Sequence, residues 1–143
     1  MPLPLSRKTF PTSLFWSGRL VEAKRVKESL LHLNAPERII RLQGLSENEL
    51  QTLYQEAALF ILPSSYEGFG LPVVEAMMAG LPVLTVHMAS LPEVGGKYAF
   101  YVDTPESSLL SKKILEIFEL PRQEAAQRVS QGQQWAKSFT WGR

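Results

Sequence analysis

The stretch from residue 59 to residue 80 constrains the fold more than any other part of the sequence. It begins with a continuous apolar run at residues 59–62 (Leu-Phe-Ile-Leu), which is typical of a strand buried on both faces. A glycine-rich loop follows, and then a helix with Pro72 in its first turn, where a missing N–H group costs nothing. Gly80 can end this helix in the left-handed conformation. This order of strand, loop and helix aims free backbone N–H groups at the loop, which favours phosphate binding.

The rest of the chain alternates short apolar segments with amphipathic ones. Amphipathic or well-capped segments predict four further helices, at residues 21–33, 46–57, 104–117 and 121–135. Apolar runs predict four further strands, at residues 14–17, 39–42, 83–86 and 98–102. This alternation predicts the α/β class, with a Rossmann-like parallel sheet covered by helices on both faces. We expect an irregular leader at residues 1–12 and a single domain at residues 13–143.

Capping residues and apolar spacing set the expected helix boundaries. Ser46 and Glu49 form a capping box that opens the helix over 46–57. The residues Thr104-Pro105-Glu106 supply the N-cap, N1 proline and early acid of the next predicted helix start. Four apolar residues are expected to form the core face of that helix: Leu109, Leu110, Ile114 and Ile117.

Two glutamates in the central stretch, Glu67 and Glu75, are separated by a segment that contains Gly-Phe-Gly-Leu-Pro. The segment resembles the Glu-x7-Glu signature of retaining, GT-B-fold glycosyltransferases of the family 4 type. Residues 49–57 are similar to the helix that precedes this signature in the family. Further similar segments follow in the family's order: Gly-Leu-Pro-Val at 80–83, Pro-Glu-Val-x-Gly at 92–96 and Phe-Thr-Trp at 139–141.

The resemblance implies that the chain binds a nucleotide sugar (a UDP-, GDP- or ADP-hexose) as substrate and needs no cofactor. In the family's pattern, Glu75 accepts hydrogen bonds from the ribose hydroxyls, and a carboxylate suits a diol because it can accept both hydrogens. The resemblance places Glu67 beside the donor sugar as the candidate catalytic residue. It also implies further donor-binding residues, namely Gly68, Phe69 and Gly70 at the sugar, Leu71 at the distal phosphate and Leu45 beside the base.

Each of these residues also has an ordinary structural interpretation. Glu75 could be a solvated side chain on a helix face, Glu67 could cap the helix that follows it, and Phe69 could be a packing residue. Arg19 and Lys24 fit the basic pair that neutralises the leaving diphosphate in the family. The spacing to the later motifs is too short by one strand and helix, so these two could instead lie on a solvated helix face. The chain then either lacks one such unit or begins at the family's next one.

Composition excludes several other classes of function. The formal net charge is +1 and aromatic residues are not interleaved with basic ones, so nothing indicates nucleic-acid binding. The chain has no cysteine, and Asp103 is its one aspartate, so an Asp-x-Asp metal clamp cannot form. We therefore expect no metal site. The lack of a signal-like or membrane-length apolar run leads us to expect a cytoplasmic protein without a transmembrane segment.

Enzymes of the GT-B type place their active site between two domains, and the resemblance covers only the donor-binding half. We therefore expect a truncated half of that fold, whose N-terminal acceptor domain lies in a longer or separate chain, and weak or no activity of the isolated chain. Two alternatives stay open. One is a non-catalytic nucleotide-binding module that needs a partner chain. The other is a hydrolase that uses Glu67 and Glu75 as its carboxylate pair.

Overall fold

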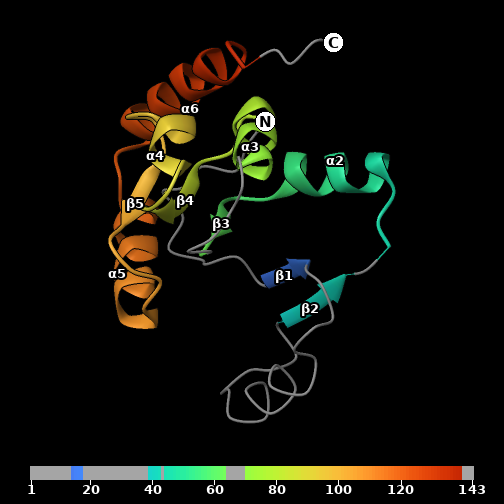
Figure 1. Cartoon of the computed structure of the whole chain (residues 1–143), viewed down its shortest axis with the longest axis horizontal. Coiled ribbons are helices and arrows are strands. Elements are labelled where there is room, and N and C mark those ends of the chain that lie inside the picture. The colour runs from blue at the N-terminus through green and yellow to red at the C-terminus, as the bar shows by residue number, and fades with distance from the viewer. Residues whose placement is uncertain (1–13, 18–38, 43, 64–69, 140–143) are drawn as a thin grey trace. The chain divides into compact units, whose positions relative to one another are not determined.

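The computed structural model of the chain describes residues 14–17, 39–42, 44–63 and 70–139 (Figure 1). These residues fall into two compact units, with the boundary between residues 50 and 51. The helix α2 (Glu47–Glu56) runs across this boundary. The predicted leader, the predicted helix at 21–33 and the single-domain organisation lie wholly or partly outside the described residues and stay predictions.

The first unit contains the strands β1 (Leu14–Ser17) and β2 (Ile39–Leu42). The two strands are parallel, with Leu14 opposite Ile39 and Ser17 opposite Leu42. Both predicted strands are thus confirmed. Parallel neighbours cannot be joined by a tight turn and need a crossover of about a dozen residues or more.

The second unit is built on a parallel sheet of β3 (Phe60–Leu62), β4 (Val83–Val86) and β5 (Phe100–Val102), in that order. Phe60 lies opposite Val83, and Leu84 lies opposite Phe100. All four residues of β4 are buried, although their side chains point alternately to the two faces. Both faces of the central strand are therefore covered, as predicted for a Rossmann-like sheet. The strand β3 is only partly buried, because among the described residues it pairs on one side only.

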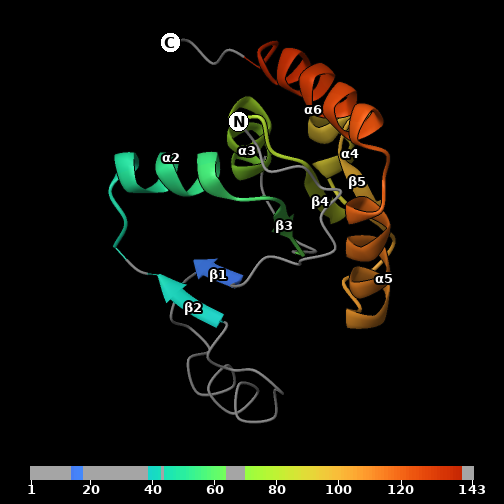
Figure 2. The same cartoon turned by 180° about the vertical axis from the view of Figure 1, so that it is seen from behind.

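Four helices complete this unit: α3 (Leu71–Met78), α4 (Leu91–Gly95), α5 (Ser107–Phe118) and α6 (Arg122–Ala136). Helix α3 packs against β3 and β4, whereas α5 packs against β5 (Figures 1 and 2). Helix α6 packs across α3 and α4. The core lies between these elements and consists mainly of valine, leucine and alanine side chains.

The predicted end of α3 is confirmed in detail. Gly80 has φ 82°, in the left-handed region that favours glycine. Its N–H donates to Met77 O at 3.1 Å, and the N–H of Leu81 donates to Ala76 O at 3.0 Å. This pair of bonds is the Schellman arrangement, which satisfies carbonyl groups at the end of a helix. The Gln133 side chain donates to Met78 O at 2.9 Å and so joins α6 to the same helix end.

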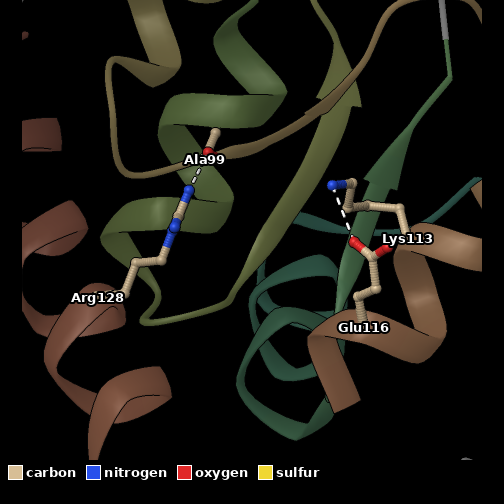
Figure 3. Close-up of polar contacts among 4 residues, drawn as sticks. All are labelled: Ala99, Lys113, Glu116 and Arg128. Carbon is tan, nitrogen blue, oxygen red and sulfur yellow. Dashed lines mark hydrogen bonds and ion pairs between the residues drawn. The ribbon is translucent and has the colours of Figure 1, made fainter. Parts of the chain in front are cut away.

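Arg128 on α6 holds the turn that leads into β5 (Figure 3). Its Nε donates to Tyr98 O at 2.9 Å, and its Nη2 donates to Ala99 O at 2.6 Å. The guanidinium also lies 3.8 Å from the centre of the Phe100 ring. Burial is the main cause that lowers the pKa of Arg128 from its usual value. One half-buried cation thus supports both the backbone of the turn and the first side chain of the strand.

Several predicted boundaries are wrong. Helix α5 begins at Ser107, because Glu106 is still extended at ψ 138°. Thr104 is therefore not its N-cap, and Pro105 is not its first residue. Leu109, which was also predicted for the core face, is 38% exposed. The core face of α5 is formed by three residues that lie about one turn apart: Leu110, Ile114 and Ile117.

The segment between β4 and β5 also differs from the prediction. It contains the short helix α4, which the sequence analysis did not predict. The strand β5 starts at Phe100 rather than residue 98, because the N–H of Tyr98 is still bonded in a turn to Gly95 O at 3.2 Å. The backbone therefore becomes extended only after this turn.

Replacing Arg128 by Met should lower the free energy of unfolding by about 2–3 kcal/mol, because two charge-assisted hydrogen bonds are lost and the carbonyl of buried Ala99 is left without its donor. Urea denaturation followed by circular dichroism measures the change. Arg122→Met is the matched control, since Arg122 is exposed at the start of the same helix. Equal effects of the two substitutions would contradict this role of Arg128.

Candidate functional site

The loop that carries the first candidate glutamate leaves the sheet at the end of β3. Thr85 is fully buried in the neighbouring strand, and its hydroxyl donates to Leu62 O at 2.9 Å. This bond satisfies the carbonyl of the last β3 residue and fixes the point where the loop departs. Glu67, Gly68 and Phe69 lie outside the described residues, so their predicted roles stay predictions.

Gly70 marks the return of the chain from this loop to the described structure. It precedes α3 with φ 79° and ψ 33°, a left-handed conformation that is strained for other residues. A β-carbon at this position would lie 3.2 Å from Leu91 Cδ2. Both the backbone conformation and the close approach of α4 therefore require a glycine where α3 begins.

The N-terminus of α3 lacks the acceptors that usually occupy such a position. Gly70 provides no side-chain cap, and the first turn of α3 contains no acidic residue. The first N–H groups of a helix lack a partner one turn back, but Pro72 has no N–H, and those of Val73 and Val74 donate to Gly70 O at 3.0 and 3.3 Å. The N–H of Leu71 and the helix dipole then favour an anion at this end. Leu71, which the sequence predicted at the distal phosphate, is the first helical residue and is 51% exposed.

Glu75 lies four residues after Leu71, which places it on the same face of α3 and about 6 Å further along the axis. Its side chain is exposed, whereas Val74 and Ala76 on either side are buried in the core. The tyrosine hydroxyl of Tyr54 donates to Glu75 Oε2 at 3.4 Å. The structure thus gives Glu75 an outward-facing carboxylate with one neutral hydrogen-bond donor.

Tyr54 is the residue at this site that the sequence analysis missed. It lies on α2 and its ring packs edge-on against Phe60, with ring centres 5.7 Å apart. Burial, followed by the negative charge and hydrogen bond of Glu75, raises the pKa of Tyr54 to about 12. The hydroxyl therefore keeps its proton at neutral pH. The sequence signals only an aromatic residue on the apolar side of α2, 21 positions before its partner.

The other predicted ligands are Leu45, Arg19 and Lys24. Leu45 is half-buried and immediately precedes Ser46, whose hydroxyl accepts the N–H of Glu49 at 3.2 Å. One half of the predicted capping box is thus confirmed, while the role of Leu45 at a base stays a prediction. Arg19 and Lys24 lie outside the described residues.

A cavity of about 360 Å³ opens between α5, β5 and α6. It lies at the beginning of β5, whereas ligands of open parallel sheets bind beyond the carboxyl ends of the strands. Its two cations are engaged, Arg128 by backbone carbonyls and Lys113 by Glu116 at 3.0 Å (Figure 3). This cavity is therefore a poor candidate for the site that the sequence predicts.

The part of the chain that the structure describes contains neither a metal-binding cluster nor a membrane-spanning helix. No group of three or more histidine, aspartate or glutamate side chains is arranged to hold a metal ion there. No helix in these described ranges is both long enough and apolar enough to cross a membrane.

Comparison with known proteins decides the family. Residues 6–135 match the glycosyl transferases group 1 family. The chain belongs to this family. The O-antigen chain mannosyltransferase B of Escherichia coli is 37% identical over 104 residues, which are 71% of this chain and 27% of that protein.

Solved structures confirm the fold of this glycosyl transferases group 1 chain. A glycosyltransferase from Rickettsia africae matches with a TM-score of 0.80 at 19% identity, over 90% of this chain and 35% of that one. The Anabaena protein Alr3699/HepE, solved in complex with UDP-glucose, matches with a TM-score of 0.78 at 22% identity, over 88% of this chain and 36% of that one. The structural neighbours are GT-B glycosyltransferases, and this chain covers only part of that fold. The match covers between about a quarter and about a third of the length of these three proteins.

Substitution of Gly70 by Ala should destabilise the second unit by about 2–4 kcal/mol, through the left-handed backbone and the contact with Leu91. Gly80→Ala is the matched control at the other end of α3. Gly80 also has a positive φ, but a β-carbon there would meet only Gln133 Nε2, at an ordinary 3.8 Å. The expected loss in the free energy of unfolding is therefore about 1–2 kcal/mol. Chemical denaturation measures both, and an equal loss would show that the contact with α4 is unimportant.

Two tyrosines should ionise only at unusually high pH, so the free energy of unfolding should depend on pH in the alkaline range. Burial raises the pKa of Tyr54 and of Tyr101 from 10.0 to about 12, so the folded state holds these protons more tightly than the unfolded chain. Their contribution to the free energy of unfolding is complete below pH 10 and is lost as the pH rises through about 12. Ultraviolet absorbance of the phenolates measures the titration. Tyr54→Phe and Tyr101→Phe should each remove one late-ionising group, and an unchanged titration curve would contradict the assignment.

Proposed function

We propose that this chain binds a nucleotide-sugar donor for retaining glycosyl transfer to an acceptor. The observation that carries the proposal is the exposed carboxylate of Glu75, one turn into a helix that begins at Gly70 without a side-chain cap, in a member of the glycosyl transferases group 1 family. The ribose hydroxyls of the donor bind Glu75, because a carboxylate accepts two hydrogen bonds from a vicinal diol. The diphosphate binds at the N-terminus of α3, where the N–H of Leu71 and the dipole favour negative charge.

The spacing along α3 supports this arrangement. Leu71 and Glu75 share one face of the helix and lie about 6 Å apart along its axis. A nucleoside diphosphate has its diphosphate and its ribose hydroxyls at opposite sides of one sugar ring, so a separation of this order allows one ligand to contact both. Gly68, Phe69, Gly70 and Leu71 then provide backbone N–H groups near the phosphate and the transferred sugar.

In the proposed reaction, Glu67 lies beside the donor sugar and stabilises the positive charge that develops at the anomeric carbon. The leaving diphosphate is stabilised by the α3 N-terminus, together with Arg19 and Lys24. This assignment needs no metal ion, and the single aspartate of the chain fits it because no Asp-x-Asp clamp can form. The sugar is transferred with retention of its anomeric configuration.

The curated relative in Escherichia coli is a mannosyltransferase, which supports a mannosyl donor for this chain as well. The complex of the Anabaena protein with UDP-glucose supports a nucleoside diphosphate sugar as the donor class. The base of the nucleotide is left to experiment among UDP, GDP and ADP.

We further propose that transfer requires an N-terminal acceptor domain, in a longer or separate chain. The matched relatives are about three times as long as this chain, and the exposed face of α3 supports a covering partner. Leu71 and Met78 flank Glu75 on this face and are 51% and 40% exposed. Alone, the chain then acts as a nucleotide-binding module with little or no transferase activity.

Calorimetric titration with UDP, GDP and ADP tests the donor site, and Glu75→Ala tests the residue that carries it. We expect saturable binding of one nucleotide, weakened by about 1–3 kcal/mol in the variant, or roughly 5- to 150-fold, because a charged hydrogen-bond acceptor is lost. Glu119→Ala is the matched control, since Glu119 is an exposed carboxylate at the end of α5. A folded chain that binds none of the three nucleotides would overturn the proposal.

A further inference from the structure

We propose that Tyr54 is a positioning residue of the donor site, whose hydroxyl holds the Glu75 carboxylate in the orientation that receives the ribose hydroxyls. This inference rests on the proposed function of Glu75 and adds a second residue to it. The structural basis is the hydrogen bond from the Tyr54 hydroxyl to Glu75 Oε2, at 3.4 Å.

The two partners differ in rigidity, so one side chain restrains the other. The Tyr54 ring is half-buried and packs edge-on against Phe60 of β3 at 5.7 Å between ring centres. A tyrosine has only two side-chain torsions, and here its ring belongs to the partly buried residues that pack against the core. Glu75 is exposed and has three torsions, so its carboxylate is mobile unless something holds it. The rigid phenol therefore restrains the flexible carboxylate, rather than the reverse.

The Glu75 carboxylate can accept further hydrogen bonds from a ligand. An ionised carboxylate has two oxygens and about four acceptor positions, and the Tyr54 hydroxyl uses one position on Oε2. Oε1 and the remaining positions can still accept the two hydroxyls of a ribose. A neutral donor also leaves the negative charge of Glu75 intact, whereas a salt bridge from Lys or Arg would compete with the ligand. The raised pKa of Tyr54, about 12, keeps the hydroxyl a donor throughout the neutral range.

Packing alone does not account for a tyrosine at this position. A phenylalanine would make the same edge-on contact with Phe60, and it would avoid the cost of partly burying a hydroxyl. Among the residues that the structure describes, the side chain that receives this hydroxyl's hydrogen is Glu75. The hydroxyl therefore has a role at the carboxylate.

A double-mutant cycle on the full chain tests the proposal, with Tyr54→Phe, Glu75→Ala and both together. Calorimetry with the nucleoside diphosphate that binds most tightly provides the readout. Tyr54→Phe should weaken binding about two- to fivefold, as for the loss of one modest hydrogen bond. In the Glu75→Ala background the same change should have no effect, because the carboxylate that Tyr54 orients is absent. The 2′,3′-dideoxy analogue of the same nucleotide should likewise bind equally to the wild type and to Tyr54→Phe.

Tyr101→Phe is the matched control. It also removes a half-buried tyrosine hydroxyl, one that donates to Gly96 O at 2.6 Å, and it should change stability without changing nucleotide affinity. A merely structural Tyr54 would weaken binding by the same factor with and without Glu75, and with the dideoxy analogue too. That result, or an unchanged affinity of Tyr54→Phe, overturns the positioning role.

The outcomes also separate this inference from the function on which it rests. If Glu75→Ala leaves ribonucleotide affinity unchanged, the assignment of Glu75 to the ribose fails, and the positioning role fails with it. If Glu75→Ala weakens binding and Tyr54→Phe does not, only the role of Tyr54 fails. Should Tyr54→Phe not fold, carbon NMR of labelled tyrosine in the wild type decides. Saturation with ribonucleotide should shift the Tyr54 Cζ signal, and the absence of a shift overturns the proposal.

Discussion

The start of α3 at Gly70 is the constraint on which the candidate site depends. A left-handed residue there turns the chain from the loop into the helix, and a β-carbon at this position would lie 3.2 Å from Leu91 Cδ2, closer than an ordinary contact. If the sequence were shifted by one position along a fixed α3, each side chain would rotate by about 100° about the helix axis, and Glu75 would leave the exposed face. One glycine therefore sets both the position of the helix N-terminus and the direction of the carboxylate.

The last helix of the unit, α6, holds α3 in place. Helix α6 approaches α3 closely at Gly132, where a β-carbon would lie 3.1 Å from Met77 Cε. Its Trp135 side chain donates to Val94 O at 2.7 Å, so the same helix also holds α4, which packs against Gly70. These contacts come from residues that follow the site by 50 positions or more. The position of the site is thus a property of the whole unit, although its chemistry belongs to α3.

Local patterns predicted the elements whose cause is local. The apolar runs of β1, β2 and β4 and the left-handed Gly80 follow from a few neighbouring residues, and the structure confirms each of them. The prediction failed where packing decides between local options. Thr104 has the side chain of an N-cap, but Glu106 is still extended and α5 begins only at Ser107. Leu109 is apolar, as a core residue would be, but it lies off the core face of α5.

The same distinction applies to the site. Glu75, Gly70 and Leu71 belong to one motif, so a sequence reader finds them together and can assign them to one ligand. Tyr54 belongs to another helix, and no spacing rule connects it to a residue 21 positions later. What brings them together is the packing of α2 beside β3, where the contact between the Tyr54 and Phe60 rings places the hydroxyl within reach of α3. A residue that acts by orienting another is therefore visible only once the elements are packed, even when the residue that it orients is evident from the sequence.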